Sequence, residues 1–81
     1  MNKQKTVSTI TLSGRQISIT NIDIFILNRL SLGATQKEIA YEMGIAHGTF
    51  KGSYAPHLFQ KLGALCAAHA VAIAIRSGII D

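Results

Sequence analysis

Few residues of this sequence have the types and spacing that catalysis or metal binding requires. Its four acidic residues include no close carboxylate pair, and there is no glycine-rich phosphate loop and no nucleophile motif. Cys66 and His69 lie three residues apart on one predicted helix, but two ligands do not complete a zinc site. We interpret them as a buried thiol and a surface or lightly buried imidazole. We therefore predict no cofactor, no metal and no enzymatic activity.

The composition indicates a small domain. Its 81 residues, 48% apolar and 15% charged, suffice for one hydrophobic core. In chains this short the core is small, and a partner subunit often enlarges it. A single cysteine cannot form an internal disulfide, which fits a reducing cytosol. The N-terminus has no apolar segment of signal-peptide length, and the most apolar stretch, residues 65 to 80, is too short and too polar to span a bilayer. We expect a cytoplasmic protein with no membrane partner.

The positive charge is unevenly placed along the chain. The net charge is +4, of which +3 lies in residues 1 to 19, with residues 1 to 5 interpreted as a flexible basic N-terminus. Residues 20 to 81 hold five Lys and Arg residues against four Asp and Glu residues, a net charge of +1. Because affinity for DNA depends largely on neutralising phosphates, a DNA-binding role would need the basic arm to contribute.

The stretch from Thr35 to Leu62 has the pattern of two helices joined by a tight turn. Thr35 followed three residues later by Glu38 is a capping box, and Gly44 supplies the left-handed residue that ends a helix. A short helix is therefore predicted from about residue 36 to residue 43. A second helical pattern follows at once through Phe50, Tyr54, Leu58 and Leu62. Two helices joined by a short turn containing glycine form a helix-turn-helix.

The segment before these helices predicts a β-hairpin and a first helix. Residues 6 to 19 alternate apolar and polar side chains around a Ser13-Gly14 turn, so one face of the hairpin can lie on the helices. Thr20 with Asp23 is a second capping box, and Gly33 ends the helix that begins there. The buried stripe of this helix is predicted to be Ile22, Phe25, Ile26 and Leu30.

The last helix is predicted in the segment from Leu65 to Ile80, where Gly78 ends the helix before Ile79 and Ile80. This helix has almost no polar face. One side can pack on the first three helices, but a domain this small cannot enclose the other side. A second copy related by a two-fold axis is the economical cover. The alternative is a helix buried wholly by its own chain, with the hairpin lying across it. The predicted dimer contact consists of Ala68, Val71, Ala72 and Ile75.

Four segments together resemble the LuxR, FixJ and GerE type of DNA-binding domain. They are KEIAYEMGI, TFK, KLG and AVAIAIRSGII, with ITNIDIFIL as the first helix. The resemblance covers residues 19 to 80 and implies a bacterial four-helix unit whose third helix enters the DNA major groove and whose fourth helix pairs two subunits. The expected fold is therefore mainly α, a LuxR-type helix-turn-helix domain over residues 20 to 81 after an N-terminal β-hairpin.

The third helix departs from the pattern of that family. The interval from Thr49 to Gly63 is one residue longer here, and the added length falls between Gly52 and Pro56. One extra residue rotates the following side chains by about 100°, and proline removes an amide from the helix. We expect a discontinuity, either a π-bulge that absorbs the residue or a break with a restart in which Pro56 occupies the first turn.

The resemblance also implies residues that contact DNA. Thr49 and Lys51 match contact positions directly, and Lys37 matches a position that reaches a phosphate, although a solvated lysine is the alternative. The remaining candidates are His47, Ser53 and Tyr54 in the same span, and Lys3, Lys5 and Arg15 in the basic arm.

We therefore expect a small stand-alone bacterial transcription regulator that binds double-stranded DNA as a homodimer. The alternative is a helix-turn-helix that has lost DNA reading and binds a protein, such as a related regulator, through its apolar last helix. Pro56, the nearly neutral helical unit and the scarcity of basic side chains favour this alternative.

Overall fold

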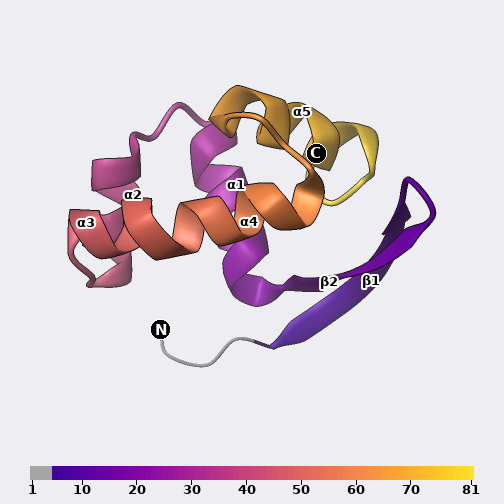
Figure 1. The fold of residues 1–81 in the computed structure, drawn as a ribbon. Helices are drawn as coiled ribbons and strands as arrows, with labels where there is room; N and C mark the ends of the chain where they lie inside the picture. The colour runs from indigo at the N-terminus through magenta and orange to yellow at the C-terminus, as the bar shows by residue number, and fades with distance from the viewer. Residues whose placement is uncertain (1–4) are drawn as a thin grey trace.

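The hairpin predicted at the N-terminus is present in the computed structural model, which describes residues 5–81 (Figure 1). Its strands are β1 (Thr6–Leu12) and β2 (Arg15–Thr20), which pair antiparallel. Ser13 and Gly14 form the turn with φ angles of 51° and 79°. Two positive φ angles in a two-residue turn are those of a type I′ turn, whose twist matches that of the strands. Ile17 and Ile19 of β2 are buried, so β2 carries the hairpin onto the helices.

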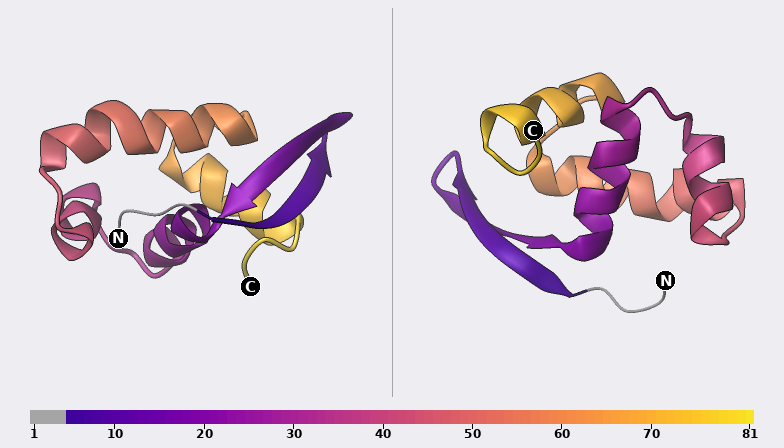
Figure 2. Two further views of the ribbon diagram at one scale, coloured as in Figure 1. Left: turned by 90° about the horizontal axis from the view of Figure 1, so that it is seen from below. Right: turned by 180° about the vertical axis from the view of Figure 1, so that it is seen from behind.

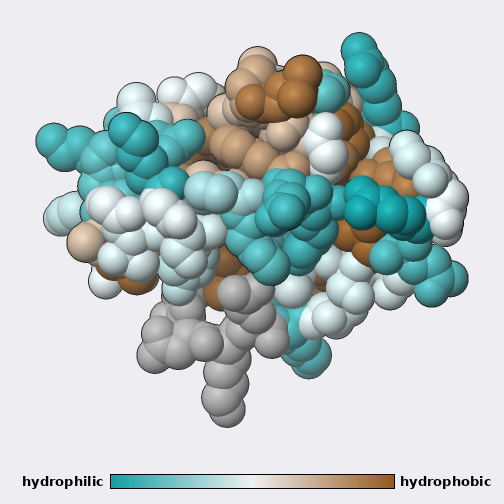
Figure 3. All heavy atoms as spheres, in the orientation of Figure 1, coloured by the Kyte–Doolittle hydropathy of each residue, from teal (hydrophilic) through white to brown (hydrophobic). Residues whose placement is uncertain are grey.

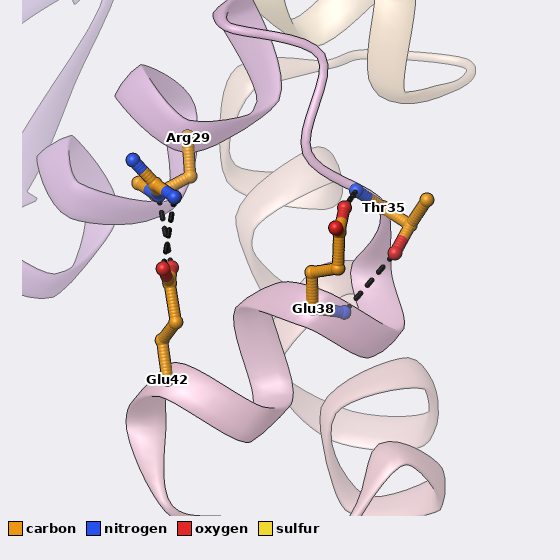
Figure 4. Close-up of polar contacts among 4 residues, drawn as sticks. All are labelled: Arg29, Thr35, Glu38 and Glu42. Carbon is orange, nitrogen blue, oxygen red and sulfur yellow. Dashed lines mark hydrogen bonds and ion pairs between the residues drawn. The ribbon is translucent and has the colours of Figure 1, made fainter.

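Both predicted capping boxes are present. They begin α1 (Asn21–Ser31) and α2 (Gln36–Met43). The Thr20 hydroxyl accepts a hydrogen bond from the Asp23 amide, and the Asp23 carboxylate accepts one from the Thr20 amide, at 3.1 and 3.0 Å. Thr35 and Glu38 repeat this exchange at 3.1 and 2.7 Å (Figure 4). Gly44 ends α2 in the left-handed conformation at φ 73°, as predicted.

The third helix runs from residue 47 to residue 62 and contains the predicted discontinuity. Its parts are α3 (His47–Thr49), the π-helical turn η1 (Phe50–Tyr54) and α4 (Ala55–Leu62). The π-bulge alternative is thus confirmed, and the break with a restart is wrong. In an α-helix Ala55 would lie about 140° around the axis from Phe50, whereas the wider turn allows both side chains to be buried. The wide turn ends just before Pro56, where an α-helical turn would press the proline ring against a carbonyl.

The last helix, α5 (Ala67–Arg76), is shorter than predicted at both ends. The chain turns at Gly63 in the left-handed conformation, and Leu65, which is 90% exposed, lies before the helix. At the other end Gly78 turns the chain back, and the Ile79 amide donates to the Ala74 carbonyl at 2.8 Å. This return brings Ile80 into the core with 6% of its surface exposed.

The helices pack around α1. Helix 47–62 crosses it, with α2 at one end of that helix and α5 and the hairpin toward the other (Figures 1 and 2). The largest fully buried side chains come from β2, α1, α2 and both halves of helix 47–62: Ile19, Ile26, Leu27, Ile39, Phe50 and Leu58. Within residues 5–81 no single helix is long and apolar enough to cross a membrane. Helix 47–62 and α5 together, bent by 44°, are the one pair of helices in this described part of the chain that reaches that length and apolarity.

Candidate nucleic-acid interface

The helix-turn-helix predicted between residues 35 and 62 is formed by α2 and helix 47–62. Three residues, from Gly44 to Ala46, connect the two helices. The Ile45 amide donates to the Ala40 carbonyl at 3.0 Å, which fixes the turn beyond the glycine. Ile39 and Phe50 are fully buried in one core, so α2 supports the first half of the following helix. The Ala46 side chain offers no cap, and the start of the second helix has no side-chain hydrogen bond.

Four of the five predicted contact residues on helix 47–62 are exposed. They are His47, Thr49, Lys51 and Ser53. Tyr54, the fifth, is half-buried, and its ring lies parallel to that of Phe50 with the centroids 6.3 Å apart. The first half of the helix therefore uses Phe50 for the core, with Tyr54 packed against it, and leaves the four exposed side chains free to meet a ligand.

At two positions of this exposed surface, Gly48 and Gly52, no side chain projects from the helix. A Cβ atom added at Gly48 or at Gly52 would meet nothing within 4 Å, and neither residue has a positive φ angle. The fold itself therefore does not require glycine at these positions, although each glycine costs a helix about 1 kcal/mol relative to alanine. What the two glycines provide is a helix surface that another molecule can approach closely.

Ion pairs within the chain neutralise two of the five basic residues of the helical unit. Lys61 lies 2.6 Å from the buried Asp23 carboxylate. Arg29 donates two hydrogen bonds, at 2.9 and 2.8 Å, to Glu42 across the gap between α1 and α2 (Figure 4). Both pairs join residues far apart in the sequence, and no local pattern predicted them. The basic residues that make no ion pair in the part of the chain that the structure describes are Lys37, Lys51 and Arg76, together with Lys5 and Arg15.

Arg15, one of the three residues of the predicted basic arm, does not lie together with the helix-turn-helix. Arg15 is the first residue of β2, beside the hairpin turn, and that turn lies at the opposite end of the molecule from α3 (Figures 1 and 2). Lys5 is tied to the start of α1, because its backbone exchanges hydrogen bonds of 2.8 and 2.9 Å with Asn21. Lys3 lies outside the described residues. An interface centred on α3 would therefore not include Arg15.

The predicted dimer face of α5 is partly covered by its own chain. Ala70 and Ala74 are completely buried, whereas Ala68 and Ile75 are exposed and Val71 and Ala72 are half-buried. The apolar atoms over this helix gather at the top of the molecule in Figure 3. The helix is therefore fully covered on the side of Ala70 and Ala74, and the opposite side, which carries the predicted contact, is only partly covered.

A hollow of about 410 Å³ adjoins this face. It lies between the α1–α2 connection and the start of α5, and its lining includes Leu30, Ala34, Ala68 and Val71. Residues 62 to 75 contain no Asp, Glu, Lys or Arg, so this surface is uncharged apart from histidine.

The candidate ligands Cys66 and His69 do not form a metal site. Cys66 is exposed, so its interpretation as a buried thiol is wrong. His69 is half-buried, as expected, and its Nδ1 accepts a hydrogen bond from the Leu65 amide at 3.0 Å. Within residues 5–81 no three His, Cys, Asp or Glu side chains are grouped so that they could hold a metal ion.

Comparison with known proteins finds no matching family model, no matching curated protein and no matching solved structure. The architecture of four helices and a two-stranded antiparallel hairpin agrees with the expected fold, and the LuxR-type resemblance remains a prediction from the sequence.

Proposed function

We propose that this chain is a small bacterial transcription regulator that binds double-stranded DNA as a homodimer. The observation that carries the proposal is the first half of helix 47–62. It follows α2 after a tight turn and presents His47, Thr49, Lys51 and Ser53 to solvent without needing them for the core. A supported helix with a free polar surface is what insertion into the major groove requires.

In this proposal Thr49 and Lys51 face the major groove, and Lys37 at the start of α2 meets a phosphate. All three are exposed, and neither lysine has an ion-pair partner within residues 5–81. The absence of side chains at Gly48 and Gly52 lets the backbone approach the groove closely. Only two basic residues carry this contact in each copy, so we propose that binding is weak for one copy and depends on pairing.

The pairing is assigned to the partly covered face of α5. A two-fold axis would bring the Ala68 and Ile75 side of two copies together, and the small side chains allow close approach. In this dimer the exposed Leu65 of one copy would pack into the uncharged hollow of the other copy.

Binding of duplex DNA across a range of salt concentrations tests the proposal. We expect Lys51→Ala and Lys37→Ala each to weaken binding and to reduce the slope of log affinity against log salt by about 1, because each removes one cation that displaces counterions from the DNA. Arg15→Ala, which removes an exposed charge beside the hairpin turn, away from α3 and outside α5, is the matched control and should leave the slope unchanged. Unchanged affinity of both lysine variants at every salt concentration would remove them from the interface.

A protein-binding helix-turn-helix is the second candidate. It is favoured by the charges, because two of the five basic residues in residues 20–81 are neutralised within the chain. Random duplex DNA at low salt separates the two functions. The regulator should bind it at least weakly, whereas the protein-binding module should show no binding.

A further inference from the structure

The hairpin has an outer edge that nothing in residues 5–81 covers. The sheet has only two strands, and it is β2 that packs against α1. Among the backbone hydrogen bonds between elements, the one nearest this edge joins the Asn21 amide to the Lys5 carbonyl, just before β1 begins. A strand edge without partners is a template for pairing with another strand.

The register identifies which backbone groups form this edge. In a hairpin with a two-residue turn, the residues flanking the turn form a hydrogen-bonded pair, and such pairs then alternate along the strands. The hydrogen-bonded pairs are therefore Leu12 with Arg15, Ile10 with Ile17 and Ser8 with Ile19. It follows that Thr9 and Thr11 direct their amides and carbonyls away from β2. We call these four groups the outer edge of β1.

Between Ser8 and Leu12 this outer edge lacks the features that usually prevent strand pairing. Strand edges are protected by charged side chains, proline or bulges. Residues 6 to 12 contain no charge and no proline. The register shifts once, between Thr6 and Ser8, so a bulge at Val7 limits the regular edge to Ser8 through Leu12. The other edge of the hairpin, by contrast, begins with Arg15.

We propose that the outer edge of β1 pairs with β1 of a second copy of this chain. The two strands run antiparallel about a two-fold axis at Ile10, which sets Thr9 of each copy opposite Thr11 of the other. These two hydrogen-bonded pairs supply about four backbone hydrogen bonds. The resulting sheet has four strands, in the order β2, β1, β1 and β2.

The side chains favour a second copy as the occupant. Ile10 already lies opposite Ile17 within the hairpin, so pairing at Ile10 extends this row to four isoleucines on one face of the sheet. On the other face threonine lies opposite threonine, and β-branched and Thr–Thr pairs are both favourable across strands. The strand carries no charge that would select an acidic or a basic partner, and none that would repel an identical strand.

The contact is small, about five residues from each copy, and belongs with weak interfaces. The pairing uses neither the helix-turn-helix nor α5, and it therefore goes beyond the proposed function and does not depend on it.

Amide hydrogen exchange and NMR on the full chain, from about 0.01 to about 1 mM, test the pairing. We expect the amides of Thr9 and Thr11 to exchange at least about twofold more slowly at the highest concentration. The amides of Gln16 and Ser18, on the outer edge of β2, should not change. A mixture of labelled and unlabelled protein should show a contact between the α-protons of Ile10 in two copies, because strands approach most closely at pairs without hydrogen bonds.

A pair of matched variants completes the test. Thr9→Lys with Thr11→Lys sets two lysines opposite two lysines across the axis and should abolish the concentration dependence. Gln16→Lys with Ser18→Lys adds the same charge to the cross-strand neighbours and should keep it. Repeating the exchange measurement on the Ala68→Glu variant distinguishes pairing through β1 from any pairing through α5. Free exchange of Thr9 and Thr11 at every concentration, or self-association that leaves their exchange unchanged, would overturn the proposal.

Discussion

The capping side chains at the starts of α1 and α2 bond to residues only three positions away along the chain. For this reason the sequence alone was sufficient to predict these contacts. A capping box needs only a hydroxyl and a carboxylate at the right spacing, and both Thr20–Asp23 and Thr35–Glu38 form as expected. The ion pair between Asp23 and Lys61 could not be predicted in this way. Its partners are 38 residues apart, and they meet only because helix 47–62 crosses α1.

Glu38 should make the stability of α2 depend on pH. Its carboxylate accepts a hydrogen bond from the Thr35 backbone amide, and this bond, followed by the one with the Thr35 side chain, lowers the pKa of Glu38 below its ordinary value of 4.5. A lowered pKa in the folded state means that the stabilisation is complete above about pH 4.5 and is lost as the pH falls through the folded value. We expect Glu38→Gln to melt at a lower temperature than the wild type at neutral pH, and the difference to disappear in acid. A difference that stays constant down to low pH would show that the charge has no part in the cap.

The two ion pairs should differ in their contribution to stability. Only 6% of the Asp23 side chain and 17% of the Lys61 side chain are exposed, so Lys61→Met leaves a buried carboxylate without its cation. We expect a loss of about 2 kcal/mol in the free energy of unfolding, measured by urea denaturation. Arg29→Met is the matched control, because its pair with Glu42 is more than a third exposed and should contribute less than about 1 kcal/mol. Equal losses in the two variants would contradict this ranking.

At the scale of the elements, the sequence predicted where helix 47–62 would be irregular but not which irregularity it would adopt. Pro56, with Gly52 nearby, marked the place from local chemistry. The choice between a π-bulge and a break depends on whether Phe50 and Leu58 can both reach the core from one continuous helix. This is a tertiary condition, and the structure meets it through the wide turn at residues 50 to 54.

Deleting Gly52 should convert the π-helical turn into an ordinary one at little cost. Phe50 and Leu58 would then be seven residues apart, which is two α-helical turns to within about 20°, so both can stay buried. We expect the free energy of unfolding to remain within about 1 kcal/mol of the wild type, with the helical circular dichroism unchanged.

The control for this deletion is the removal of Gln60, an exposed residue of α4 with no wide turn to compensate for it. That deletion rotates Leu62 about 100° away from the core and should cost about 2–5 kcal/mol. Similar costs for the two deletions would contradict the role assigned to the π-helical turn.

At the scale of the whole molecule, periodicity and turn residues were sufficient to predict the order of elements, a hairpin followed by four helices. The arrangement in space was harder to infer, because it depends on contacts between distant segments. Arg15 was grouped with the other basic residues by sequence position, yet the hairpin carries it away from α3. α5 was expected to need a partner on every side not covered by the first three helices, and the structure shows one side buried at Ala70 and Ala74 with the opposite side only partly covered.

Self-association through α5 should be sensitive to a charge on its partly covered side. Ala68 is exposed, so Ala68→Glu can be accommodated in a single copy, but a two-fold interface would bury the carboxylate twice without a partner. We expect the dimerisation affinity to fall at least about tenfold in sedimentation equilibrium, with the melting temperature nearly unchanged. Gln60→Glu introduces the same charge on α4 as a control. Self-association equal to that of the wild type would place the contact between copies elsewhere.

The packing of α5 on α1 also has a consequence for synthesis on the ribosome. Of the four helices described here, α5 leaves the exit tunnel last and closes the core around α1, so a nascent chain that ends before Ala70 has no cover for that side of α1. The hairpin and α1 can associate early, whereas cooperative folding has to await the emergence of α5 from the tunnel. Force measurements on stalled chains of increasing length should therefore show one late folding event, and an early event of full size would show that the first three helices fold without the fourth.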